Sequence, residues 1–197
     1  MAARDWTGYY DGQGEREPRE LLREALDRSE HEHPPGNAVD LGCGQGIESV
    51  ELLRRGWTVL AIDAEPEGIR RLRERVGDAA RLTTAVSPMQ DAELPATDLV
   101  HASFSLPFCP PEAFPELWMR IRTALRPGGR FVGELFGDRD TWASDPTMTF
   151  FEVGAARALF DGMEIESFVE EEEDGEGFDG PKHWHVFHAI ARRTDAS

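Results

Sequence analysis

A glycine-rich segment and a later aspartate are the residues whose spacing points most directly to chemistry. Residues 39–46 read Val-Asp-Leu-Gly-Cys-Gly-Gln-Gly, and Asp63 ends the next apolar run. Three closely spaced glycines let the backbone approach a ligand and adopt positive φ without steric cost. An acidic residue about twenty positions after the first glycine is suited to hydrogen bonding with ribose hydroxyls. The pattern therefore predicts a site for an adenosine-bearing ligand.

The positions of the third glycine and of a preceding aspartate separate two kinds of ligand. The dinucleotide fingerprint is G-x-G-x-x-G, but here Gly46 falls one residue early and Ile47 fills the last fingerprint position. Asp40 places a carboxylate beside the loop. Because a carboxylate repels a pyrophosphate and attracts a sulfonium or an amino group, the loop favours a sulfonium cofactor over a dinucleotide.

Residues 40–46 of this chain, Asp-Leu-Gly-Cys-Gly-Gln-Gly, resemble the first motif of the class I S-adenosyl-L-methionine (SAM)-dependent methyltransferases. The resemblance runs from about Trp6 to Arg193. Later segments are similar to a bacterial subgroup close to the tellurite-resistance and thiopurine-type small-molecule methyltransferases, namely 98–108, 110–114, 125–129, 136–142 and 183–188. The resemblance implies a single-domain, Rossmann-like α/β fold. Its seven-stranded, mostly parallel sheet would have the order 3-2-1-4-5-7-6, with strand 7 antiparallel and helices on both faces.

Alternating strand and helix patterns support a mostly parallel α/β sheet. We expect strands at 38–41, 58–62, 81–86, 98–104 and 130–136, and helices at 18–29, 47–55, 67–76, 112–125 and 151–160. Two further strands, 163–170 and 184–191, are joined without a helix by the acidic stretch 171–181, so they should pair antiparallel. The predicted organisation is an N-terminal lid segment and helix (1–36), the methyltransferase domain (37–193) and a tail (194–197).

The resemblance implies the residues that bind SAM and its product, S-adenosyl-L-homocysteine (SAH). The glycine loop would pass under the methionine and ribose, Asp63 would take the ribose hydroxyls, and Ala64, Met89 and Gln90 would surround adenine. The candidates are Tyr10, Asp40, Gly42, Cys43, Gly44, Gly46, Asp63, Ala64, Met89, Gln90, Ser103 and Phe104.

Three of these candidates have other interpretations. Met89 could be ordinary core, and Asp63 could cap the helix that starts near Pro66. Tyr10 could form a lid over SAM, or it could be a surface aromatic or a packing anchor for the first helix.

The acceptor side is less well defined by the sequence. Methyl transfer from SAM is an in-line displacement in which the protein mainly aligns donor and acceptor and excludes water. If a base is needed, the candidates are His101, His183 and His185, although His101 lies in the middle of a strand and could instead be a satisfied core histidine. The last two, near the acidic run 170–174, could also suggest a metal, but we expect none, since a histidine pair on a strand more often packs or hydrogen-bonds. Arg139 and Phe108 are candidate acceptor contacts, with Arg139 either binding a carboxylate or ordering a loop.

Composition narrows the class of partner. The formal net charge of −17 opposes binding to nucleic acid or to an anionic membrane surface. No run of eighteen apolar residues is present, and the polar N-terminus does not resemble a signal peptide. Two cysteines, Cys43 and Cys109, do not suggest a disulfide framework, so we expect a reducing cytoplasm.

The sequence thus predicts a SAM-dependent methyltransferase for a small-molecule acceptor, present as a monomer or homodimer. The acceptor atom stays open among oxygen, nitrogen, sulfur and heavier chalcogens. The alternatives are a non-catalytic SAM-binding or regulatory protein and an NAD-dependent oxidoreductase.

Overall fold

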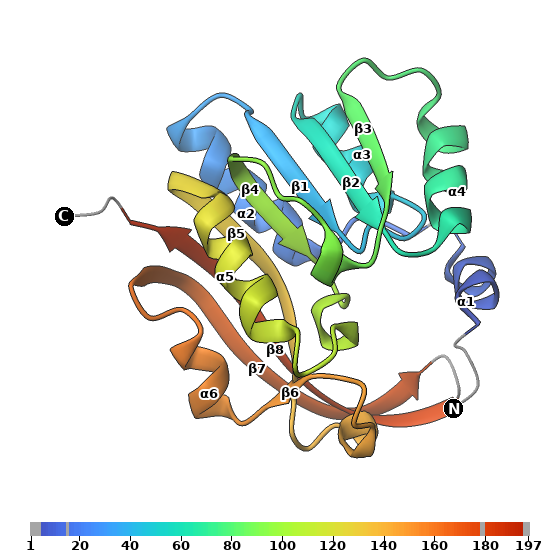
Figure 1. Ribbon diagram of the computed structural model, residues 1–197, viewed down its shortest axis with the longest axis vertical. Helices are drawn as coiled ribbons and strands as arrows, with labels where there is room; N and C mark the ends of the chain where they lie inside the picture. Colours follow the sequence, from blue (N-terminus) through green and yellow to red (C-terminus); the bar gives the residue numbers. More distant parts are fainter. Residues whose placement is uncertain (1–4, 15, 178–179, 195–197) are drawn as a thin grey trace.

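The structure, a computed structural model, describes residues 5–14, 16–177 and 180–194 (Figure 1). Helices and strands alternate along most of the chain, as the sequence predicts. The helices are α1 (Trp6–Gln13), α2 (Glu20–Glu32), α3 (Ile47–Arg54), α4 (Pro66–Val76), α5 (Phe114–Ala124) and α6 (Val153–Ala158), with short 3-10 turns η1 (Met89–Asp91), η2 (Leu106–Phe108) and η3 (Thr141–Ser144). The strands are β1 (Asn37–Leu41), β2 (Thr58–Asp63), β3 (Leu82–Val86), β4 (Thr97–Ala102), β5 (Leu125–Gly137), β6 (Phe150–Phe151), β7 (Met163–Gly177) and β8 (Gly180–Arg193).

One sheet joins all of these strands in the order β3-β2-β1-β4-β5-β8-β7, with β6 paired to β5. The pairs among β1 to β5 are parallel, whereas β8 runs antiparallel to both β5 and β7. This arrangement confirms the predicted fold class and strand order, with β7 and β8 as the predicted sixth and seventh strands. The two-residue β6, which was not predicted, accounts for the extra strand.

Helices cover both faces of the sheet, with α5 and α6 on one face and α2 and α3 on the other (Figure 1). The apolar side of α5 is buried through Phe114, Leu117 and Ile121, and it packs with strand residues such as Val100 and Phe131. On the opposite face, α2, α3 and α4 supply buried leucines and an isoleucine to a second cluster, with strand residues such as Val59, Leu99 and Val132. None of the described helices combines the length and the apolar composition that a membrane span requires.

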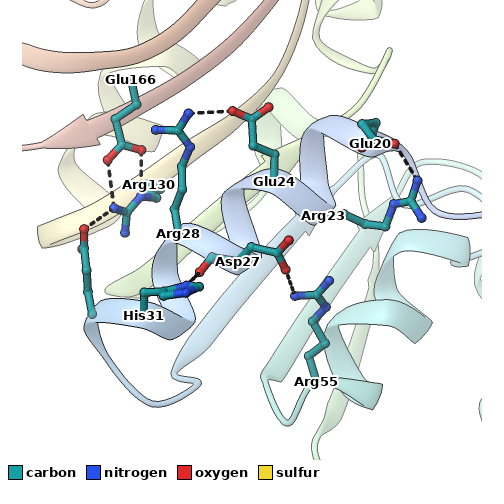
Figure 2. A pocket seen from close by; sticks show the side chains of 10 residues that line it. Glu20, Arg23, Glu24, Asp27, Arg28, His31, Arg55, Arg130 and Glu166 are labelled. Atoms are coloured by element: carbon teal, nitrogen blue, oxygen red, sulfur yellow. Dashed lines mark hydrogen bonds and ion pairs between the residues drawn. The ribbon is translucent and has the colours of Figure 1, made fainter.

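An ion-pair network fastens α2 to the sheet beside a charged surface groove (Figure 2). Arg130 of β5 is 2% exposed, and its guanidinium lies 2.8 Å from Glu166 and 2.9 Å from Glu32. Across the groove, Arg55 pairs with Asp27 at 2.5 Å. Because these side chains pair with one another, we infer that the network serves to hold α2 in place.

Four of the differences from the sequence prediction have a clear structural origin. Helix α1 was not expected, and β5 starts at Leu125 because Leu125 pairs with Thr97 of β4. Helix α6 starts late because Phe151 belongs to β6. The stretch 171–181, expected to be a solvated connection, instead forms the ends of β7 and β8, since most of its residues pair across the hairpin. Residues 195–197 of the predicted tail, 1–4 and 15 of the lid segment and 178–179 lie outside the described residues.

Candidate cofactor and acceptor site

A cavity of about 840 Å³ opens at the carboxyl ends of the parallel strands, where ligands bind in doubly wound sheets. Its walls come from α1, the loop after β1, the ends of β2 and β4, η1, and the outer part of β7 and β8. Figure 1 shows α1 lying near the ends of these strands. Segments far apart in the sequence therefore meet in one pocket.

The glycine loop has the backbone that its sequence predicts. Gly42, Gly44 and Gly46 have φ values of 77°, 51° and 80°, in the left-handed region. A Cβ at Gly46 would lie 2.3 Å from Leu72 Cδ1, so this glycine lets the start of α3 pack directly on α4. The third glycine thus serves helix packing one residue earlier than in the dinucleotide fingerprint.

Asp63 closes the loop from the neighbouring strand. Its Oδ2 accepts a hydrogen bond of 2.7 Å from the Gly44 N–H, and its Oδ1 accepts one of 2.8 Å from the Glu65 N–H. Burial raises the pKa of Asp63, and these two backbone hydrogen bonds oppose the rise. The residue lines the pocket, and the N-cap of α4 is Glu65, so Asp63 does not cap that helix.

The residues expected around adenine, Ala64, Met89 and Gln90, line the same pocket at the ends of β2 and β3. Met89 also packs against the main hydrophobic cluster, so its two interpretations are compatible. The Gln90 carbonyl accepts a hydrogen bond from Arg120 of α5, which fixes η1 in place.

Helix α1 forms the outer wall beside the glycine loop. Tyr10 is 4% exposed, and a Cβ at Gly44 would lie 3.3 Å from its ring. An ion pair of 2.7 Å between Asp11 and Arg71 fastens α1 to α4. Tyr10 is therefore not a surface aromatic, and its role as a lid stays a prediction.

Asp40 and His101 lie beneath the loop and not in the pocket. Asp40 Oδ2 accepts a 2.5 Å hydrogen bond from the Ser49 hydroxyl, and Asp40 Oδ1 lies 2.9 Å from His101 Nδ1. Burial disfavours the imidazolium, but the hydrogen bond and charge of Asp40 outweigh it and raise the pKa of His101. Each side chain is 2% exposed, and neither lines the cavity. The predictions of a cofactor contact by the Asp40 side chain and of His101 as a base are therefore wrong, because the two groups satisfy each other in the interior.

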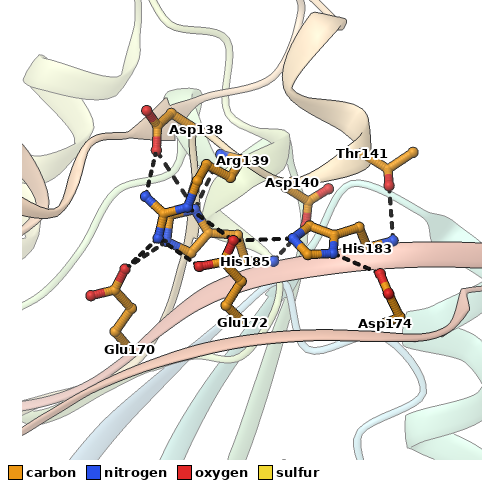
Figure 3. A network of polar contacts seen from close by, with 9 residues as sticks. All are labelled: Asp138, Arg139, Asp140, Thr141, Glu170, Glu172, Asp174, His183 and His185. Carbon is orange, nitrogen blue, oxygen red and sulfur yellow. Dashed lines mark hydrogen bonds and ion pairs between the residues drawn. The ribbon is translucent and has the colours of Figure 1, made fainter.

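The other two candidate bases also point away from the cavity. Side chains alternate along a strand, so Trp184 and Val186 of β8 line the pocket while His183 and His185 face the opposite side. There His183 Nδ1 lies 2.7 Å from Asp174, and His185 is fully buried (Figure 3). Both predictions of a catalytic base on β8 are wrong for this reason.

Arg139 belongs to the same network outside the pocket (Figure 3). Its guanidinium lies 2.7 Å from Glu170 and 2.8 Å from Glu172, so it orders the hairpin and does not reach an acceptor in the cavity. The prediction of Arg139 as an acceptor contact is wrong.

The two glutamates and His185 are close enough together to hold a metal ion, but the hydrogen bonds oppose it. Both ring nitrogens of His185 already have partners, since the Arg139 backbone N–H donates to Nδ1 at 3.1 Å and Nε2 lies 3.0 Å from both Glu170 and the Arg139 guanidinium. The Arg139 guanidinium lies among these three groups and already supplies the positive charge that a metal ion would bring.

Aromatic side chains form the other half of the pocket, away from the glycine loop. Besides the predicted Phe104 and Phe108, the rings are Trp6, Phe136, Trp142 and Trp184. Phe104 has a φ of 49°, and its N–H donates to the buried Glu134 carboxylate at 3.1 Å. Such backbone is uncommon for a bulky residue and persists where the surrounding structure holds it. Glu171 and Glu173 of β7 also line this half.

Two arginines that the sequence analysis did not select reach the pocket from the segment between α1 and α2. Arg16 pairs with Glu48 at 2.6 Å, and the Arg19 guanidinium lies 4.2 Å from the centre of the Phe104 ring. The sequence signal that could have found the aromatic half is the alternation in 183–188, with Trp184 and Val186 on one face.

Comparison with known proteins agrees with this geometry. Residues 38–129 match the model of a family described as a methyltransferase domain. This segment is a methyltransferase domain. The resemblance to class I SAM-dependent methyltransferases is thereby confirmed, and SAM is the cofactor of that family. The groups in the pocket fit SAM, because the Asp63 carboxylate can accept hydrogen bonds from ribose hydroxyls and the three loop glycines expose their backbone to the cavity.

Individual curated relatives match only about half of the chain. The chain is 33% identical to a carboxy-S-adenosyl-L-methionine synthase of Citrifermentans bemidjiense over 49% of this chain and 43% of the relative. It is 30% identical to an uncharacterized methyltransferase of Synechocystis over 59% and 55%, respectively. The chain thus spans about half the length of the curated relatives it matches.

Solved structures share the fold of the methyltransferase domain. TehB from Haemophilus influenzae superimposes with a TM-score of 0.74 at 18% identity, over 87% of this chain and 62% of TehB. The N-methyltransferase NodS from Bradyrhizobium japonicum, in complex with SAH, superimposes with a TM-score of 0.69 at 17% identity, over 90% and 87%. At these identities the likeness shows the fold alone.

Proposed function

We propose that this protein transfers a methyl group from SAM to a small-molecule acceptor by in-line displacement. The observation that carries the proposal is a single cavity of about 840 Å³ with the glycine loop and Asp63 at one end and an aromatic wall at the other. SAM, when bound, supplies a methyl group activated by a sulfonium. The protein's task is then to align the two reactants and exclude water.

The chain's own groups divide this task between them. Asp63 holds the ribose hydroxyls, and the glycine loop, which lines the same pocket, lets the cofactor approach its backbone. Arg19, beside the aromatic wall, offers a positive charge to the carboxylate of the amino-acid part. The rings of the acceptor half exclude water from the reacting atoms, which strengthens the electrostatic interactions there.

A small acceptor fits the charge and the size of the pocket better than a polymer does. The net charge of −17 opposes nucleic acid, and the pocket is within the size range of small-molecule sites. Both cysteines are buried and free, which supports a reducing compartment, and we place the protein in the cytoplasm as a monomer or homodimer.

Titration calorimetry with SAM, SAH and NADH tests the cofactor. We expect SAM and SAH to bind and NADH not to bind. Tight NADH binding without SAM binding would overturn the proposal in favour of an oxidoreductase.

A screen of oxygen, nitrogen, sulfur and chalcogen acceptors with mass detection of the methylated product tests the reaction. SAM binding without product across a broad panel would favour the alternative of a non-catalytic SAM-binding protein. That alternative has one observation in its favour, since His101, His183 and His185 all lie outside the pocket.

A further inference from the structure

We propose that the acceptor is an amine carried on a flat apolar body, bound in its cationic form against the aromatic wall and selected by Glu171 and Glu173. This inference rests on the proposed function and names the substrate class of the same pocket.

The aromatic wall is a connected surface of ring faces and edges. The centroids of Trp6 and Phe108 lie 4.9 Å apart, and those of Phe108 and Trp142 lie 6.3 Å apart. Trp142 lies 6.1 Å from Trp184, and Trp184 lies 6.0 Å from Phe104. All five rings line the cavity, so a planar apolar molecule can stack or pack edge-on against them.

The same rings already bind cations within the protein. The Lys182 ammonium lies 4.0 Å from the centre of the Trp184 ring and 4.3 Å from that of Trp142. Arg19 stacks on Phe104 at 4.2 Å. Electron-rich ring faces attract positive charge, and they do so more strongly when water is excluded. Lys182 is paired with Asp140, so this internal cation adds no net charge to the wall.

Acidic residues outnumber basic ones around the cavity. Among the described lining residues, six are acidic and two are arginines. Glu48 pairs with Arg16 at 2.6 Å, and Glu171 lies 3.2 Å from His188 Nε2. Glu171 and Glu173 both stand on the acceptor side of the pocket. A pocket of this charge attracts a cation and repels an anionic acceptor.

Strand pairing explains why these two glutamates face the cavity. Glu171 lies opposite Val186 and Glu173 lies opposite Trp184 in the antiparallel β7–β8 pair. Directly opposite residues share a face of the sheet, so both carboxylates stand beside the aromatic wall. Their neighbour Glu172 points to the other face, where it pairs with Arg139.

Methyl transfer from SAM to an amine accounts for every bond, proton and electron pair. The bound ammonium first releases one proton to the carboxylate of Glu171 or Glu173, which is exposed and passes the proton on to solvent outside the pocket. The neutral nitrogen then uses its lone pair to form a bond to the methyl carbon, and the carbon–sulfur bond breaks with its electron pair returning to sulfur. The products are an N-methylammonium and the neutral thioether SAH.

Binding to the SAH-saturated protein tests the inference without requiring turnover. The probes are 2-phenylethylamine, 2-phenylethanol and phenylacetate, which share a ring and differ in charge. By calorimetry we expect the amine to bind about tenfold or more tightly than the other two, and salt to weaken its binding.

Variants that each remove one negative charge test whether Glu171 and Glu173 select the amine. Glu171→Gln and Glu173→Gln should each weaken the amine about three- to tenfold and leave the alcohol unchanged. Glu176→Gln is the matched control, because Glu176 is an exposed glutamate on the same strand that does not line the pocket. Retained amine affinity in both pocket variants would overturn the assignment of these residues.

The two proposals fail in different ways. Absence of SAH binding refutes the proposed function before any acceptor is added. If SAH binds but the amine binds no better than the alcohol or the carboxylate, or does not bind at all, only the inference of an amine acceptor is refuted.

Discussion

Replacing Asp63 by asparagine tests the cofactor end of the pocket. The carboxylate is 9% exposed and accepts backbone hydrogen bonds from Gly44 and Glu65 at 2.7 and 2.8 Å. Asparagine keeps one acceptor oxygen and turns an NH₂ group toward the second donor. One backbone N–H then loses its partner, which should lower the free energy of unfolding by about 1–3 kcal/mol.

The effect on binding follows from the charge of the lost acceptor. A hydrogen bond to a charged group contributes about 1.5–3 kcal/mol, so SAM affinity should fall roughly 10- to 100-fold. SAH should lose affinity by the same factor, because the ribose is common to both ligands. A contact of Asp63 with the sulfonium would instead weaken SAM alone.

Titration calorimetry with both ligands, at a temperature where the variant is folded by circular dichroism, measures these losses. Glu65→Gln is the matched control, since Glu65 lines the same pocket and its side chain makes no capping hydrogen bond. The control should lose less than about threefold. Asp63→Asn affinities within twofold of the original protein, or a loss as large in the control, would refute the reasoning.

Three further perturbations test the lid, the buried lysine and the interior histidine. Tyr10→Ala should weaken SAM about tenfold by removing the ring beside the loop, while Tyr10→Phe should not, and equal calorimetric affinities would remove the lid hypothesis. Lys182→Met should destabilise the fold by about 3 kcal/mol in urea unfolding because Asp140 is left buried and unpaired, and the double variant with Asp140→Asn should recover part of the loss. The raised pKa of His101 stabilises the fold fully below pH 6.5, and this contribution is lost as pH rises through the folded pKa. Unfolding free energies at several pH values should therefore fall less steeply in His101→Asn, and parallel profiles would contradict the assignment.

The two ends of the pocket differ in how well they can be predicted from the sequence. The cofactor end depends on local chemistry, since glycines with positive φ and an acid at a strand end keep their meaning wherever the chain goes. The acceptor end depends on which face of β7 and β8 is turned inward. A shift of one residue exchanges the two faces of a strand. The alternation in 183–188 places Trp184 and Val186 on one face, but only the strand pairing shows that this face is turned toward the pocket.

The sequence by itself indicated the α/β class of the fold and the glycine loop, because hydrophobic periodicity and glycine spacing are local properties, whereas the order of the strands came from the resemblance to the methyltransferase family. The tertiary structure alone decided which polar residues reach the pocket. It placed Asp40 against His101 in the interior, and it turned His183 and His185 away from the cavity. It also brought Arg19 and Glu171, some 150 residues apart, into one wall. Such contacts depend on the packing of distant segments, and a one-dimensional pattern carries no information on that packing.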